Sequence, residues 1–446
     1  MYLINNNMIM KNSEKKGNSD ITTFRIAILA EEPLGWGSGK HYFPIILDNY
    51  SWEINKRKYK FVTEYIYDKD ILNGKLNIKN YDVLLVPGGG VGDGESIVKG
   101  FNKFKKVKNW KKQIRKFVED GGGYVGICGG TALMTELYTK NNENKNFVEK
   151  LYDKSSIGLS CVKSYYKELS LPIFNLSQNN PEKIGAMSYV FSFSPGKTIN
   201  GDFIHTGGVP IEFEINKDNP IFSDLSKDKE KIRWWGGPAL IAPKETDRNI
   251  KILAKYPKED LSENKSTRIY AWNYKGGLFG LFRGAYEALK LIKKEGISLR
   301  FLLLYSFYLA GTWEKTNVPI DLDYGAKASI ISEIYPNKNK GRIILCTSHP
   351  EYLIWNGGEI IESSKKFNSL AFGLHKWINI SYLNKSIEGD LTHTWWIIRR
   401  FVAWAAKVSD NSLPPIINEE NKENINKIIN KNILWDGSIV NQMNNI

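Results

Sequence analysis

The sequence predicts an α/β fold built on a doubly wound, mostly parallel β-sheet with helical insertions. Short apolar runs recur along the first third of the chain, separated by glycine-rich loops and an amphipathic helical stretch. Alternation of strands and helices is typical of parallel sheets. Another apolar run at residues 342–347 places a strand of the same kind late in the chain. The sheet is therefore expected to draw on most of the sequence.

Composition favours one large folded unit with polar ends. Hydrophobic residues make up 42% of the 446 residues and charged residues 25%, as in ordinary globular proteins. We expect a disordered leader at residues 1–21, a single domain at residues 22–410 and a polar, Asn- and Lys-rich tail at residues 411–446. Two apolar helical patterns in residues 276–335 predict a helical insertion within the domain.

The formal net charge of +14 does not by itself identify a partner, because the lysines are spread along the whole chain. The densest basic run, residues 99–116, has apolar residues every three or four positions. This pattern is typical of an amphipathic helix whose lysines face water. No nucleic-acid partner is expected.

Cysteine usage and hydropathy predict a cytoplasmic protein without a transmembrane segment. The chain has three cysteines, Cys128, Cys161 and Cys346, and no CxxC pair. They are too few and too scattered for a disulfide framework or a zinc site. The longest apolar stretch, residues 301–313, is shorter than the roughly 18 residues that a membrane span needs.

Each expected strand is recognised by its apolar run and the turn residues after it. Residues 24–30 lead into Glu31 and Glu32, and residues 81–86 lead into a Pro-Gly-Gly-Gly loop. After the basic helix, three glycines suit a left-handed helix end. Further strands are expected at residues 124–127, 203–205, 212–215, 250–256, 269–272 and 342–347, and a closing helix at residues 395–405.

Cys128 is the first candidate for chemistry. It occupies the centre of Gly-Ile-Cys-Gly-Gly, which has the G-x-nucleophile-x-G form of a strand-to-helix elbow. Such a turn is expected to hold the cysteine exposed, and the N-terminus of the following helix favours the thiolate. The elbow alone also fits a small buried cysteine without reactivity.

His349 and Glu351 supply what a thiolate nucleophile needs. They follow the strand at residues 342–347 and are separated by Pro350. If proline keeps this segment extended, both side chains point the same way. A base next to the nucleophile and an acid that orients the base form a catalytic triad.

A glycine loop provides candidate donors to a developing oxyanion. Gly89 and Gly90 lie at the carboxyl end of one predicted strand, and Gly129 follows the cysteine. Ligand sites of parallel sheets lie at the carboxyl ends of the strands, where all three motifs fall. An ordinary turn between strand and helix also favours glycine.

The three motifs PGGG, GGYVGICGG and SHPE resemble the class I glutamine amidotransferase superfamily, and within it the biotin-protein ligase N-terminal-like group. The resemblance covers about residues 24–408 and implies a flavodoxin-like fold. It implies a nucleophile at Cys128, a base at His349, an orienting acid at Glu351, and oxyanion donors at Gly89 or Gly90 and at Gly129.

The sequence departs from this family in three ways. Ala132 stands where members that use glutamine usually carry Gln, so a substrate other than glutamine is favoured. His349 lies 221 positions after Cys128, so insertions must separate them. No synthetase, phosphate-binding loop or biotin-ligase motif is present, and no cofactor or metal is expected.

The resemblance implies a thiol hydrolase or amidotransferase that forms a thioester at Cys128. The enzyme then passes the thioester to water, or it passes the released ammonia to a separate synthetase or ligase subunit. The substrate is a small-molecule amide or carboxyl compound. Two alternatives stay open: a protease- or deglycase-type thiol enzyme in which Glu31 or Glu32 tunes the cysteine, and a non-catalytic module that binds a metabolite or partner. In the binding module, Trp234, Trp235 and Trp272 could line the site, although core packing is their commoner use.

Overall fold

The computed structural model describes the greater part of the chain. The described residues are 21–31, 39–48, 50–88, 99, 106–139, 145–167, 192–197, 203–264, 267–268, 270–274, 279, 282, 286, 313–337, 339–356, 361–362 and 390–417. Residues 1–20 of the expected leader and most of the expected C-terminal tail lie outside them, whereas Ile21 is the first residue of a strand.

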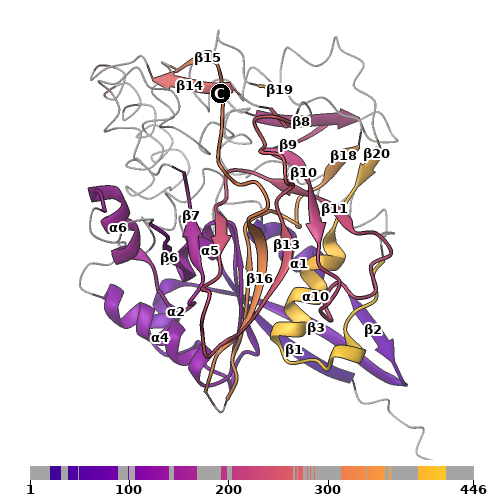
Figure 1. Ribbon diagram of the computed structural model, residues 1–446. Helices are drawn as coiled ribbons and strands as arrows, with labels where there is room; N and C mark the ends of the chain where they lie inside the picture. Colours follow the sequence, from indigo (N-terminus) through magenta and orange to yellow (C-terminus); the bar gives the residue numbers. More distant parts are fainter. Residues whose placement is uncertain are drawn as a thin grey trace, which may run out of the picture.

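A mixed β-sheet forms the centre of the molecule (Figure 1). Within the described residues it has 13 strands: β1 (Ile21–Leu29), β2 (Ser51–Ile54), β3 (Arg57–Ile66), β4 (Val83–Val86), β5 (Gly123–Ile127), β6 (Glu136–Leu137), β7 (Lys163–Tyr165), β10 (Val209–Ile215), β11 (Lys229–Trp234), β12 (Ala239–Ile241), β13 (Asn249–Lys255), β16 (Ala328–Ile334) and β17 (Arg342–Cys346). The main strand order is β11-β10-β13-β16-β17-β5-β4-β1-β3-β2.

The five central strands, β17, β5, β4, β1 and β3, pair in parallel. Antiparallel strands extend this centre on both sides, with β2 on β3 and with β16, β13, β10 and β11 beyond β17. We call β10, β11, β13 and β16 the antiparallel wing. The parallel pairing expected from the sequence thus occurs at the centre of the sheet. Parallel neighbours need crossover connections, usually helices, and these helices bury both faces of the strands.

Helices cover both faces of the parallel centre. Within the described part they are α1 (Gly39–Leu47), α2 (Asp68–Leu72), α4 (Val107–Glu119), α5 (Gly129–Met134), α6 (Phe147–Ser155) and α10 (Trp395–Ala405), with a 3-10 turn at Asp410–Ser412. Val83 and Leu85 of β4 join a core cluster with α1 and α10, whereas Leu84 and Val86 join one with α2 and α4. Adjacent residues of a strand point to opposite faces, so β4 is apolar throughout.

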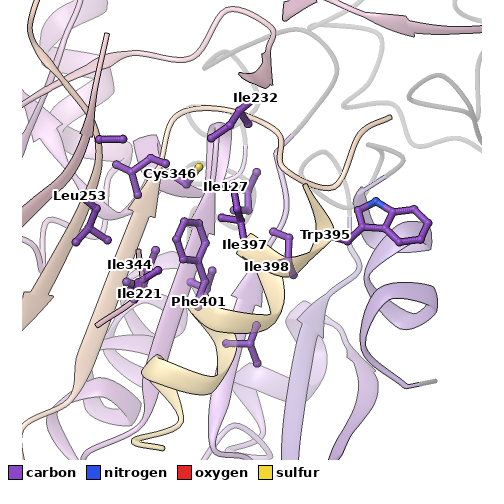
Figure 2. Packing of buried hydrophobic residues seen from close by; sticks show 14 of the residues in the cluster. Ile127, Ile221, Ile232, Leu253, Ile344, Cys346, Trp395, Ile397, Ile398 and Phe401 are labelled. Atoms are coloured by element: carbon purple, nitrogen blue, oxygen red, sulfur yellow. The ribbon is translucent and has the colours of Figure 1, made fainter. Parts of the chain in front are cut away.

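The larger core cluster lies between the parallel strands and α10 (Figure 2). Ile127 at the end of β5 and Ile344 on β17 contact this layer, and Phe401 of α10 packs against it. Every residue of α10 is buried. The strand ends that carry Cys128 and His349 are therefore fixed to a closely packed layer.

Three short sheets complete the described strands. They are β14 (Tyr270–Tyr274) with β15 (Trp313–Pro319), β18 (Ile354–Asn356) with β20 (Asp390–Thr392), and β8 (Ser192–Lys197) between β9 (Phe203–Gly207) and β19 (Ile361–Glu362). Most of the expected helical insertion at residues 276–335 lies outside the described residues. Its last part forms strands instead, and β16 belongs to the main sheet.

The basic helix ends as the sequence predicts. Gly121 has a left-handed backbone with a φ of 109°, and the N–H of Gly122 bonds to the carbonyl of Phe117 at 2.9 Å. This closes α4 with a glycine that the backbone conformation requires. Trp110, Ile114 and Phe117 form its buried face.

Candidate active site

Cys128 lies at a strained turn between β5 and α5. Its φ of 46° and ψ of −107° are unusual for a residue with a side chain. Glycines make this turn possible, because a Cβ on Gly130 would lie 2.3 Å from the carbonyl oxygen of Val86 and one on Gly126 would lie 2.7 Å from the carbonyl carbon of Gly130. The elbow expected from the sequence is present in the backbone.

The thiol of Cys128 is not exposed, contrary to the expectation for such an elbow. Its exposed fraction is 0%, and the residue belongs to the core cluster that contains α10. Its N–H donates to the carbonyl of Cys346 at 2.7 Å, which ties the turn to the end of β17. The thiol is buried because the turn at the end of β5 packs into this core cluster.

Two side-chain hydroxyl groups stabilise the elbow by hydrogen bonds to backbone carbonyls. The Thr131 hydroxyl lies 2.8 Å from the carbonyl oxygen of Gly126 and 2.9 Å from that of Cys346. The Tyr124 hydroxyl donates to the carbonyl of Gly130 at 2.7 Å. These bonds connect β5, α5 and β17, and they hold the cysteine backbone in its strained conformation.

His349 and Glu351 contact each other directly. Nδ1 of His349 lies 2.8 Å from Oε1 of Glu351, and both side chains have an exposed fraction of 0%. The segment is a turn rather than the extended stretch expected, because Tyr352 N–H bonds to the carbonyl of His349 at 3.2 Å. Pro350 follows His349 in this turn, a position that its fixed φ suits.

Gly88 brings the cysteine and the histidine to one place. A Cβ on Gly88 would lie 2.6 Å from the Cβ of Cys128 and 2.8 Å from Cε1 of His349. Both side chains therefore border the same small volume at the end of β4. The first glycine of the Pro-Gly-Gly-Gly loop leaves space for both.

Three buried polar atoms of residues 348–351 have no hydrogen-bond partner among the described residues. They are Nε2 of His349, Oε2 of Glu351 and Oγ of Ser348. With Nδ1 of His349 donating to the carboxylate, the neutral imidazole has Nε2 as an acceptor. A buried acceptor without a donor costs free energy unless a substrate or a reacting proton uses it.

The turn that carries His349 and Glu351 rests on the start of α10. Trp395 Nε1 donates to the carbonyl of Glu351 at 2.9 Å, and the Thr394 hydroxyl donates to that of Pro350 at 3.1 Å. The Tyr352 ring stacks on the His349 imidazole with centroids 4.6 Å apart. None of these supporting contacts was expected from the sequence.

Arg233 of β11 also contacts this turn and was not identified from the sequence. Its carbonyl accepts a hydrogen bond from the N–H of His349 at 2.7 Å. Its guanidinium is fully buried, and burial lowers its pKa to about 9, which leaves it charged at neutral pH. The sequence gives one signal for Arg233: it is a charged residue directly before two tryptophans. Trp234 and Trp235 themselves are core residues, with exposed fractions of 0% and 1%.

The expected oxyanion donors are only partly described. Gly89 and Gly90 lie outside the described residues, whereas Gly129 is the first residue of α5. The N–H groups of the first helical turn have no acceptor within the helix. Gly129 therefore offers a donor next to the cysteine.

Glu31 has a structural partner at the other side of the parallel centre. Its Oε2 accepts the N–H of Asp68 at 2.7 Å at the start of α2. Lys99 lies nearby, with Nζ 2.7 Å from Oδ1 of Asp68 and 3.3 Å from the carbonyl oxygen of Glu31. Glu31 thus stabilises the N-terminus of a helix. Glu32 lies outside the described residues.

Among the described residues, no three His, Cys, Asp or Glu side chains have an arrangement that could hold a metal ion. The same part of the chain contains no helix long and apolar enough to span a membrane.

Comparison with known proteins gives a short sequence match. No family model matches the chain. Over 77 residues it is 29% identical to phosphoribosylformylglycinamidine synthase subunit PurQ of Picrophilus torridus, which covers 17% of this chain and 31% of that protein. The chain thus matches about a third of that protein's length. The crystal structure of SMU.1228c is similar at a TM-score of 0.22 and 13% identity, over 52% of this chain and 67% of that one.

Proposed function

We propose that this chain is a class I glutamine amidotransferase-like thiol enzyme with a flavodoxin-like fold that cleaves an amide through a thioester at Cys128. The observation that carries the proposal is the convergence of Cys128 and His349 on Gly88, with Glu351 bonded to the far side of the imidazole at 2.8 Å. A nucleophile, a base and a group that orients the base are the parts of a triad.

The reaction follows from the positions of the protons. Nε2 of His349 takes the proton of the Cys128 thiol, and the sulfur attacks the carbonyl carbon of the amide. Gly129 N–H, with Gly89 or Gly90, donates to the oxyanion. When the C–N bond breaks, His349 returns the proton to the leaving nitrogen. Water then attacks the thioester with His349 as base, which releases a carboxylic acid and regenerates the thiol.

The substrate in this proposal is a small-molecule amide or carboxyl compound. Ala132 stands where members that use glutamine usually carry Gln, and it is buried in α5 beside the elbow. Its methyl group cannot hydrogen-bond an amide. An amide other than glutamine is therefore favoured, and released ammonia would serve a separate synthetase or ligase subunit. Membership in the biotin-protein ligase N-terminal-like group rests on PGGG, GGYVGICGG and SHPE.

Covalent labelling tests the nucleophile separately from the substrate. The protein is incubated with an electrophilic glutamine analogue and, in parallel, with chloroacetamide, and the adducts are located by intact-mass and peptide mass spectrometry. We expect a single adduct on Cys128 that is lost in Cys128→Ser and greatly slowed in His349→Ala. An unmodified Cys128 beside a modified Cys161 or Cys346 would count against the proposal.

A binding module is the second candidate, because Cys128 and His349 are both fully buried in this structure. In that case the triad is idle and the region around Gly88 holds a metabolite. Ligand-dependent thermal shifts that persist in Cys128→Ser, without turnover of any amide, would favour the module.

The protease- or deglycase-type alternative places the controlling acid after β1. Glu31 is already bonded to Asp68, and Gly129 stands where that family usually has His directly after the cysteine. Both observations favour the triad. Retained activity in His349→Ala together with lost activity in Glu32→Gln would favour the alternative.

A further inference from the structure

Both ends of the turn that carries His349 and Glu351 are bonded to one residue of the antiparallel wing. The main chain of Arg233 binds the N–H of His349 at 2.7 Å. Its side chain binds the carbonyl of Leu353, four residues later, through Nε at 3.3 Å and Nη2 at 3.0 Å. We infer that Arg233 is a positioning residue that holds His349 and Glu351 in register for Cys128, an inference that rests on the proposed function.

Arg233 lies directly opposite His349 in the backbone pairing. Arg233 and His349 form an isolated antiparallel bridge. Residues directly opposite each other in such a pair project their side chains to the same face. Tyr352, whose ring stacks on the imidazole, belongs to the same turn. Arg233 therefore holds the turn on the face to which the His349 side chain also projects.

The guanidinium connects two segments of the chain. Nη1 donates to the carbonyl of Gly208 at 3.3 Å, while Nε and Nη2 share the carbonyl of Leu353. Gly208 has a φ of 73°, and a Cβ there would lie 2.1 Å from the carbonyl oxygen of Trp234. Only a planar fork with several donors can bridge both carbonyls; the single ammonium of lysine cannot reproduce that geometry.

A buried cation at this place costs stability, which argues for a functional reason. Arg233 has an exposed fraction of 0%, and its hydrogen-bond acceptors among the described residues are carbonyl oxygens rather than a carboxylate. Carbonyl oxygens offset only part of the desolvation of a full charge. An apolar side chain would fill the volume at lower cost but would release the carbonyl of Leu353.

The inference gives the wing a role at the active site. His349 lies 221 positions after Cys128, and all four wing strands, including β11, come from the sequence between them. Thr394 and Trp395 hold the same turn from the α10 side. Arg233 supplies the opposing support, so the turn is fixed between the wing and α10.

The test compares Arg233→Gln and Arg233→Lys with Arg400→Gln. Arg400 is also buried and also bonds to carbonyl oxygens, those of Pro414 and Pro220, although it pairs in addition with the Asp224 carboxylate at 2.9 Å. Two readouts are followed in the full chain: the rate of chloroacetamide addition to Cys128 against pH, and the low-field proton resonance of His349 Nδ1–H, assigned by its loss in His349→Ala.

We expect Arg233→Gln to slow Cys128 modification roughly 10- to 100-fold and to weaken the low-field resonance, because small displacements of reacting groups cost about that much. Arg233→Lys should recover part of both, and Arg400→Gln should change neither beyond about twofold although it lowers thermal stability. An unchanged rate and resonance in folded Arg233→Gln would overturn the inference. If Arg233→Gln does not fold, the same comparison is made with Arg233→Lys.

These readouts separate the inference from the proposed function. If wild-type Cys128 does not react but the resonance is present and is lost in the Arg233 variants, Arg233 positions the pair and the proposed chemistry is wrong. If Cys128 reacts with help from His349 and the Arg233 variants match wild type, the proposed function stands and the inference is wrong.

Discussion

At the scale of single residues, the site depends on how closely the backbone of Gly88 approaches two side chains. Its hydrogen atom occupies the volume where a methyl group would lie 2.6 Å from the Cβ of Cys128 and 2.8 Å from Cε1 of His349. Such distances are far below van der Waals contact, so any side chain at this position must push the two groups apart.

Gly88→Ala should therefore damage the site more than the fold. We expect Cys128 modification by chloroacetamide to slow roughly 100-fold, with a stability loss of about 1–3 kcal/mol in urea denaturation. Gly74→Ala is the matched control, because Gly74 has a φ of 79° but no atom within 4 Å of its added Cβ. It should lose stability and keep the wild-type rate. Equal labelling rates for Gly88→Ala and wild type would contradict the expected geometry.

The other two cysteines should not compete with Cys128 at neutral pH. Burial raises the pKa of the Cys346 thiol. Burial, assisted by the nearby Glu333 charge, raises the pKa of Cys161. Below a raised pKa a thiol has less of the reactive thiolate, so labelling of Cys161 should increase as the pH rises above 9. Peptide mass spectrometry after labelling at pH 7 and pH 10 measures this, and rapid Cys161 labelling at pH 7 would contradict it.

The sequence motifs predicted candidate chemical groups, but they did not predict the residues that support those groups. Cys128, His349 and Glu351 belong to short motifs whose residue types and order carry the signal. The role of Gly88 arises from contacts with residues 40 and 261 positions away, and Arg233 meets His349 only after the sheet has formed. Contacts of this kind have no local pattern, so a single sequence does not contain them in readable form.

At the scale of elements, the start of α10 holds the turn that carries Glu351. Trp395→Phe removes the indole N–H that donates to the carbonyl of Glu351 at 2.9 Å and leaves this buried acceptor without it. We expect a loss of about 1–3 kcal/mol in urea denaturation and slower labelling of Cys128.

Trp396→Phe is a close control for this prediction. Trp396 lies next in the same helix and is equally buried, but its indole N–H has no hydrogen-bond partner among the described residues. Removing it should cost little beyond packing and should leave labelling unchanged. If both variants slow labelling equally, the hydrogen bond to Glu351 is not what matters.

Strands with a continuous apolar run were predicted well, whereas alternating strands were predicted only in part, as in the case of β10. β4 and β5 were expected because they are buried on both faces. β3 was missed, because Lys and Arg alternate with its buried Tyr59 and Phe61 on a partly exposed strand. β16 was included in the expected helical insertion because its position in the sheet is set by pairing with β17 and β13, which are close only in space.

At the scale of the whole molecule, the parallel centre and the antiparallel wing share one core. A single hydrophobic cluster runs from Trp52 on β2 to Trp234 on β11. The wing also pairs with the centre through β16 and β17. Neither part can lose its packing without exposing apolar surface of the other, so we expect them to unfold together.

Glu333→Gln tests this cooperativity from the wing. Glu333 is fully buried on β16 and binds Arg248 and Ser160, which ties β13 and the turn before β7 to the sheet. Loss of its charge should destabilise the protein by about 1–3 kcal/mol. Because the core is shared, hydrogen-exchange mass spectrometry should show protection falling by the same free energy in peptides from β13 and from β4 and β5. Reduced protection in the wing alone would mean that the wing opens independently, and the turn that carries His349 would then lose its support from Arg233 without global unfolding.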